Sequence, residues 1–163
     1  MDFSIHVKKE NRELPVATEK LSKLTSAAFK LTGKKPGDIS LVVCGDGFIH
    51  ELNRKFRGID SPTDVLSFSM REGEVFDDGE DILGDIVISV DTAQRQAGIH
   101  IDFEFDETYL DGSHINKLLQ EEFLFLYTHG LLHLLGYTHE DQESEKIMTD
   151  QAKKLLSGVV QTK

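Results

Sequence analysis

Apolar and polar positions repeat along the chain with two different periods, and these periods separate expected strands from expected helices. The opening segment DFSIHV alternates at every second residue, which predicts a strand because neighbouring strand side chains point to opposite faces. The runs DISLVVC and DILGDIVIS are almost continuously apolar and predict buried strands. A fourth strand is expected from about Asp64, after the turn SPTD.

Apolar residues that recur three and four positions apart predict the helices. The helices are expected over Pro15 to about Leu31, over GFIHELNRKF with Asp46 as a possible N-cap, over Asp91 to about Ala97, over Ile115 to about Leu135, and over about Gln142 to Leu156. Proline favours the first helical turn and glycine follows helix ends, so Pro15 and Gly33 frame the first of these helices.

Strands and helices are interspersed, which predicts an α+β fold (α/β in the broad sense) with a four-stranded mixed sheet and about five helices. A length of 163 residues indicates a single domain, residues 1–163. The one cysteine, Cys44, lies in the apolar run ISLVVC and is expected to be a buried hydrophobe in a reducing compartment. No secretory signal and no 18-residue apolar run is present, so we expect a cytoplasmic protein without a membrane span.

The charge balance leaves the partner open. The formal net charge of −11, from 29 acidic and 18 basic residues, argues by itself against binding to nucleic acid. Much of the acid is local, however, with six acids in residues 71–81 and five in residues 100–114. Both segments are expected to be solvated loops or flaps, so the net charge does not describe every face of the protein.

The segment THGLLHLLGYTHE concentrates the candidate chemistry. His129 and His133 are four residues apart, so a helix places them on one face, one turn above each other. Gly136 can end the helix in a left-handed conformation and turn the chain, which brings His139 back to the same point. Three imidazoles with one open position are typical of a catalytic zinc site, where a bound water has a pKa near ~7. The alternative is two core histidines and one surface histidine.

The same spacing occurs in the extended zinc motif of metzincin proteases, but one residue differs. Those enzymes have glutamate directly after the first histidine as the general base, whereas this chain has Gly130. A glycine abstracts no proton, which weighs against a peptidase or requires a base from elsewhere.

Three blocks of the sequence resemble one known family. HGLLHLLGYTH, LNRKFRGIDSPTDVLSFS and LGDIVIS are similar to the corresponding segments of the YbeY-type bacterial rRNA-maturation endoribonucleases. The resemblance implies a metzincin-like α+β fold, one zinc ion on the three histidines, and cleavage of single-stranded RNA. It also implies a role in ribosomal RNA maturation, notably at the small-subunit 3′ end, and in ribosome quality control. The chain departs from the family at Thr138, where aspartate is usual, and in a longer stretch between His100 and His114.

Arg57 and His129 are the predicted catalytic residues. Arg57 matches an arginine that the family needs for activity, and a guanidinium can bind phosphate through two points and offset charge in the transition state. Without the resemblance, a solvated cation at a helix end is the simpler interpretation. Asp64 is expected to have a structural role or to reach the site. Asp85 is expected to accept hydrogen bonds from a neighbouring loop or from the other ring nitrogen of a ligand histidine, with general base as a weaker alternative.

Three hypotheses follow. The first is a zinc-dependent endoribonuclease with single-stranded or ribosomal RNA as substrate and the ribosome as partner, and the second is a metalloprotease. The third is a non-catalytic, metal-supported module that binds ribosomes or proteins. This last hypothesis predicts a fourth protein ligand, such as Cys44 or Glu140.

Overall fold

A four-stranded mixed sheet and five helices form the described part of the chain, residues 2–71, 81–97 and 112–160 of a computed structural model. The strands are β1 (Ile5–Lys9), β2 (Asp38–Cys44), β3 (Val65–Ser69) and β4 (Ile82–Ser89). The helices are α1 (Thr18–Thr32), α2 (Asp46–Arg57), α3 (Val90–Gln96), α4 (Gly112–Leu134) and α5 (Gln142–Val160). The predicted α+β class, sheet and helices are confirmed.

The strand order β1-β2-β4-β3 leaves β3 at an outer edge of the sheet. The pairs β1–β2 and β2–β4 are parallel, whereas β3 runs antiparallel to β4. Parallel neighbours require crossover connections, and α1 supplies one between β1 and β2. The antiparallel outer strand is the part of the sheet that contributes to the candidate site.

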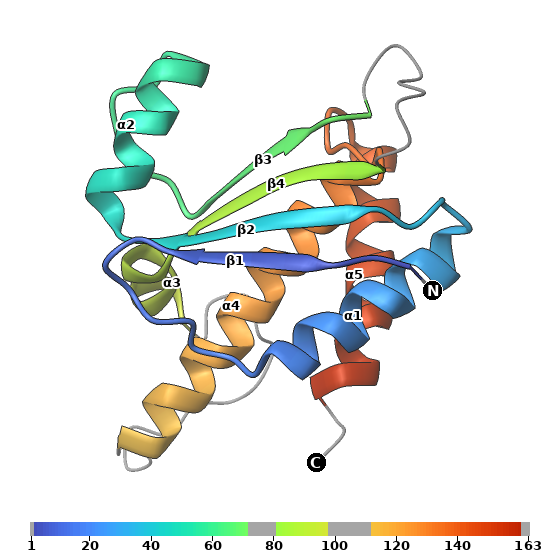
Figure 1. Ribbon diagram of the computed structural model, residues 1–163, viewed down its shortest axis with the longest axis horizontal. Coiled ribbons are helices and arrows are strands. Elements are labelled where there is room, and N and C mark those ends of the chain that lie inside the picture. The colour runs from blue at the N-terminus through green and yellow to red at the C-terminus, as the bar shows by residue number, and fades with distance from the viewer. Residues whose placement is uncertain (1, 72–80, 98–111, 161–163) are drawn as a thin grey trace.

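Helices cover the two faces of the sheet unequally. In Figure 1, α1, α4 and α5 lie on one side of the sheet, and α2 projects from the other side beside β3. The large core cluster joins Ile39, Leu41 and Ile86 of the sheet to the three-helix side. A smaller cluster of Cys44, Ile49, Leu66 and Val87 lies under α2. Cys44 is fully buried there, as predicted.

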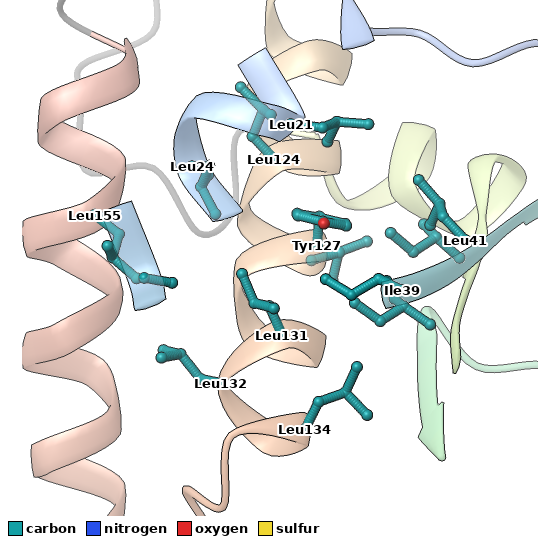
Figure 2. Packing of buried hydrophobic residues seen from close by; sticks show 14 of the residues in the cluster. Leu21, Leu24, Ile39, Leu41, Leu124, Tyr127, Leu131, Leu132, Leu134 and Leu155 are labelled. Atoms are coloured by element: carbon teal, nitrogen blue, oxygen red, sulfur yellow. The ribbon is translucent and has the colours of Figure 1, made fainter. Parts of the chain in front are cut away.

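The longest helix, α4, occupies the centre of the large core. Figure 2 shows its side chains Leu124, Tyr127, Leu131 and Leu132 between neighbouring elements, with Leu155 of α5 on one side and β2 on the other. The buried Tyr127 hydroxyl lies 2.7 Å from Thr25 Oγ1 of α1. Burial on several sides fixes α4 rigidly, and this matters because two of the candidate histidines belong to it.

Several predicted helix starts differ from the observed ones, and α4 begins at Gly112, three residues before the expected Ile115. The first helix begins at Thr18, three residues after Pro15, because the backbone of Ala17 is still extended. Asp46 is the first residue of α2, not its N-cap, which is Gly45. Its carboxylate instead accepts hydrogen bonds from Ser89 Oγ and Thr92 Oγ1, at 2.8 and 2.6 Å.

The acidic segments predicted as loops or flaps lie mostly outside the described residues, which omit 72–80 and 98–111. The ends of the first segment are held together by an ion pair of 2.6 Å between Arg71 and Asp81. Across the described residues, every helix is too short or too polar to cross a bilayer.

Candidate metal centre and cleft

The helix that carries the first two histidines ends in a tight hydrogen-bonded turn at Gly136. The backbone N–H of Tyr137 donates to the Leu132 carbonyl and the N–H of Gly136 donates to the His133 carbonyl, both at 3.0 Å. This pair of bonds defines a Schellman motif, and Gly136 has the positive φ of 99° that the motif requires. The predicted glycine turn is confirmed, and it directs residues 137–139 back along the end of the helix.

The turn brings His139 to the two helical histidines. One ring nitrogen from each of His129, His133 and His139 lies within 4.8 Å of the others. The Nε2 atoms of His129 and His133 are 3.0 Å apart. The ring centroid of His139 lies 5.6 Å from that of His129 and 4.9 Å from that of His133. Two imidazoles from one face of α4 and a third from the turn after it thus face one point.

Hydrogen bonding fixes which nitrogen of His133 faces the other two rings. Its Nδ1 lies 3.0 Å from the Tyr137 carbonyl oxygen, which can only accept, so Nδ1 carries the proton. The lone pair is then on Nε2, the atom beside His129. Burial and the nearby His139 lower the pKa of His133, and the bond to Tyr137 offsets part of that effect. His133 is therefore neutral at neutral pH, which is the form that binds metal ions.

The histidine cluster fits a divalent ion such as zinc. Zinc–nitrogen distances of about 2.0–2.1 Å in a tetrahedral site place ligand nitrogens roughly 3.4 Å apart. The observed nitrogens, with one pair at 3.0 Å and all within 4.8 Å, need only small side-chain rotations to meet that spacing. Within the described residues this group contains no cysteine or carboxylate, so neither Cys44 nor Glu140 joins it. The ligand set leaves room for a substrate or water.

The histidines open into a cleft of about 580 Å³ that follows the outer strand. All of β3 lines it, together with the end of α2 and the turn after α4. The helices α2 and α4 lie on opposite sides of the sheet (Figure 1). The cleft runs along β3 and is lined by residues of both helices. Arg57 and Asp64 line this cleft with the three histidines, so the structure brings five of the six predicted site residues together.

Arg57 is exposed at the last residue of α2, in a turn that also contains Arg54 and Lys55. Arg54 is engaged by Glu51 at 2.8 Å. No carboxylate forms an ion pair with Arg57 among residues 2–71, 81–97 and 112–160. Its guanidinium is thus available, within this part of the chain, to bind an anion that enters the cleft.

Asp64 combines a structural contact with a place in the cleft. Its Oδ1 accepts the backbone N–H of Val65 at 2.7 Å and lies 3.4 Å from the Thr63 hydroxyl. These contacts hold the chain where β3 begins. The pKa of Glu122 on α4 is raised by burial and, to a smaller extent, by the negative charge of Asp64.

Asp85 does not line the cleft with the histidines, so of its two predicted roles the bond to a ligand histidine is not formed. Its neighbours on β4, Gly84 and Ile86, face α4. A Cβ added at Gly84 would contact Leu134 of α4, and a Cβ added at Gly130 of α4 would contact Ile86. Asp85 projects to the opposite face and lines a separate groove with His6 and Asp38. The Tyr137 carbonyl oxygen accepts the hydrogen bond from His133 Nδ1, a role considered for Asp85.

Gly130, which replaces the glutamate of proteases, has a packing role. A Cβ added there would lie 3.0 Å from Ile86 Cγ2 and 3.4 Å from Val65 Cγ2. This position therefore faces the sheet, and the small residue lets α4 approach β3 and β4 closely. Thr138, at the position where the resembling family usually has aspartate, is exposed and lines the cleft.

Sequence reasoning missed two aromatic residues of the cleft. Phe56 and Phe68 both line it, and their rings meet edge to face with centroids 5.4 Å apart. An aromatic side chain directly before Arg57 was the available signal. Its exposure could not be read from the amphipathic pattern of α2, in which a phenylalanine predicts the buried face.

Fold and cleft together define a class of small α+β proteins with a cluster of three histidines beside an outer strand. The profile of one family, "Endoribonuclease YbeY", matches residues 5–160 of the chain. The chain belongs to this family.

Individual relatives agree over most of the chain. An endoribonuclease YbeY of Pelotomaculum thermopropionicum is 46% identical over 121 residues, which cover 73% of this chain and 70% of that protein. One of Moorella thermoacetica is 37% identical, with 98% of this chain and 97% of that protein covered. The solution structure of TM1509 from Thermotoga maritima superposes with a TM-score of 0.56 at 26% identity, over 95% of this chain and 88% of that chain.

Proposed function

We propose that this protein is a zinc-dependent endoribonuclease that cuts single-stranded RNA and acts in the maturation of ribosomal RNA. Family membership supports the RNA substrate. The observation that carries the proposal is a cleft that holds three metal-binding imidazoles and an arginine without an ion-pair partner in the described part of the chain. In this proposal the enzyme acts at the small-subunit 3′ end and in ribosome quality control. Its partner is the ribosome and its location is the cytoplasm.

His129, His133 and His139 would hold the ion. A zinc ion held there would supply Lewis-acid chemistry, which favours attack of water on a phosphodiester. The protein's own contribution is to orient: the turn at Gly136 positions His139, and the Tyr137 carbonyl keeps His133 in the tautomer that presents Nε2. Burial keeps His133 neutral by lowering its pKa.

Arg57 is the residue that would bind the reacting phosphate. Its planar guanidinium can donate two parallel hydrogen bonds to phosphate oxygens. Negative charge grows on these oxygens as the P–O bond to the leaving nucleotide breaks, so the same contacts strengthen in the transition state. Lys55 and Arg57 in the last turn of α2 also attract an anionic strand to an otherwise acidic protein, whereas the charge of Arg54 is paired with Glu51.

One observation favours a peptidase as the second candidate. The outer strand β3 lines the cleft along its whole length, and extended peptides bind many proteins by adding to such an edge. Gly130 argues against this candidate because its position faces Ile86 and Val65 and provides no base. A phosphodiester hydrolase can do without that glutamate, since a phosphate oxygen can accept the proton.

The test compares substrates and variants of the metal-loaded protein. Wild type should cleave a short unstructured RNA, leave a stable duplex intact and leave casein intact. His133→Ala should lose both zinc and cleavage. Arg57→Ala should retain zinc and the wild-type circular dichroism spectrum but lose turnover, and Arg57→Lys should restore little because an ammonium lacks the two-point contact. Arg54→Ala, one turn earlier and engaged with Glu51, is the matched control and should cleave normally. Casein cleavage without RNA cleavage would replace this proposal with the peptidase.

A further inference from the structure

Phe56 is the most exposed large apolar side chain in the described part of the chain, with 58% of its surface accessible. It occupies the last turn of α2, directly before Arg57. The other phenylalanine of that helix that is exposed, Phe48, is 38% accessible and does not line the cleft. An aromatic ring that remains in water beside a cleft is an unfavourable arrangement for stability alone, because its apolar area is unburied.

The surroundings of Phe56 hold the ring in place without covering it. Phe68 of β3 supports it edge to face, with ring centroids 5.4 Å apart and planes at 64°. The Lys55 ammonium lies 5.3 Å from the Phe56 ring centroid. An exposed cation–π contact is weak, so Lys55 can move aside to a phosphate when another group takes its place over the ring. Phe56, Phe68 and Arg57 all line the cleft that contains the three histidines.

We propose that Phe56, supported by Phe68, is a stacking platform for one unpaired nucleobase of the RNA whose phosphate Arg57 binds. This inference rests on the proposed endoribonuclease function and adds the residue that selects single strands. Aromatic side chains beside a positively charged groove bind single-stranded nucleic acid in this way, and the contact tolerates every base because each has a π-face. Because Phe56 and Arg57 are consecutive residues, one nucleotide can contact the ring with its base and the guanidinium with its phosphate.

The same contact explains why a duplex would be a poor substrate. A base in a helix is already stacked on both faces, so Phe56 can engage it only after the base leaves the stack. That step requires unstacking and unpairing, which an unstructured strand avoids. Phe56 would thus act as a specificity-determining residue in substrate binding, and its loss should change the amount of RNA needed for half-maximal rate more than the maximal rate.

The experiment is single-turnover cleavage with metal-loaded protein in excess over a short unstructured RNA. Phe56→Leu keeps an apolar side chain but removes the ring, and it should raise the half-saturating protein concentration about 5-fold or more, up to about 150-fold. Phe56→Tyr keeps the ring and should behave like wild type. Phe48→Leu on the same helix is the matched control and should also behave like wild type. Zinc content and circular dichroism accompany each variant.

A second measurement identifies the base that stacks. A set of RNAs carries one abasic nucleotide at each position around the cleaved bond. At one position, removal of the base should weaken wild type as much as Phe56→Leu does, with no further effect in the Phe56→Leu variant. Such non-additivity is the sign of a direct contact.

Three results would overturn the inference. If wild type cleaves RNA and Phe56→Leu has the same half-saturating concentration, the enzyme assignment stands. The exposed ring would then be assigned to a protein contact instead. An equal loss in Phe48→Leu and Phe56→Leu would show a general effect of apolar surface. Absence of RNA cleavage by wild type, with zinc bound, would overturn the proposed function and the platform together.

Discussion

Replacing Gly84 by alanine should disrupt the packing between β3, β4 and the end of α4. Gly84 has a φ of +152°, which side chains other than glycine rarely adopt. A Cβ there would collide with the Phe68 carbonyl oxygen and would lie 2.8 Å from Leu134 Cδ2 and 3.1 Å from Ser69 Cα. Two of these three contacts are backbone atoms of β3, which cannot retreat without breaking the β3–β4 pairing.

The magnitude follows from two separate effects. Overpacking of a well-packed site destabilises by about 1–3 kcal/mol. Backbone strain at a glycine-only conformation adds roughly 1–3 kcal/mol. A combined loss of about 2–6 kcal/mol is a large share of the roughly 5–15 kcal/mol that stabilises a typical domain. A loss of about 3 kcal/mol would lower the Tm of a protein of this size by about 6–12 °C.

Urea unfolding followed by circular dichroism measures this loss, and two glycines provide matched controls. Gly33 also has a positive φ, +67°, but an added Cβ meets nothing within 4 Å, so Gly33→Ala should show backbone strain alone, about 1–2 kcal/mol. Gly47 in α2 is open and unstrained, so Gly47→Ala should be neutral or stabilising by up to about 1 kcal/mol. If Gly84→Ala were no less stable than Gly33→Ala, the collision with β3 would be refuted.

Three further predictions concern buried groups. Burial raises the pKa of the Cys44 thiol to about 12, so Ellman's reagent at pH 8 should react with unfolded but not native protein; rapid native reaction would contradict the burial. Tyr127→Phe removes the hydrogen bond to Thr25 and should lower the free energy of unfolding by about 1 kcal/mol, measured in urea; an unchanged midpoint would show that the bond contributes nothing net. Burial, with the charge of Asp64, raises the pKa of Glu122 to about 8 from an ordinary value near 4.5. As pH rises, Glu122 loses its proton at a lower pH in the unfolded chain than in the folded protein. The free energy of unfolding should therefore fall between about pH 4.5 and 8, and Glu122→Gln should flatten its pH dependence over this range.

The periodicity of the sequence was sufficient for the sheet and helices because each element buries apolar residues at its own repeat. The histidine cluster was also predictable, since a four-residue spacing and a turn glycine are local properties of HGLLHLLGYTH. The meeting of Arg57 with these histidines was not local. It depends on the outer position of β3 in the strand order, which brings α2 and α4 to one cleft from opposite sides of the sheet.

The failed expectations also have a physical cause. LGDIVIS is buried on both faces, so its pattern contains no signal of which face Asp85 shares with α4. Asp46 was predicted as a cap because aspartate favours that position, but its partners Ser89 and Thr92 lie more than forty residues away. The exposure of Phe56 was not predicted, because a position at the rim of a cleft leaves no trace in helical periodicity.

The position of the histidines at the carboxyl end of α4 has an electrostatic consequence. His133 lies in the last turn of the helix, where the macrodipole concentrates about half a negative elementary charge. A cation held by the imidazoles would also neutralise this charge and would hold the turn at Gly136 in place through His139. Occupancy of the centre and the integrity of the helix end are then thermodynamically linked. The last turn of α4 should exchange its amide hydrogens more slowly in the metal-loaded protein, while amides of β2 in the sheet interior remain unchanged.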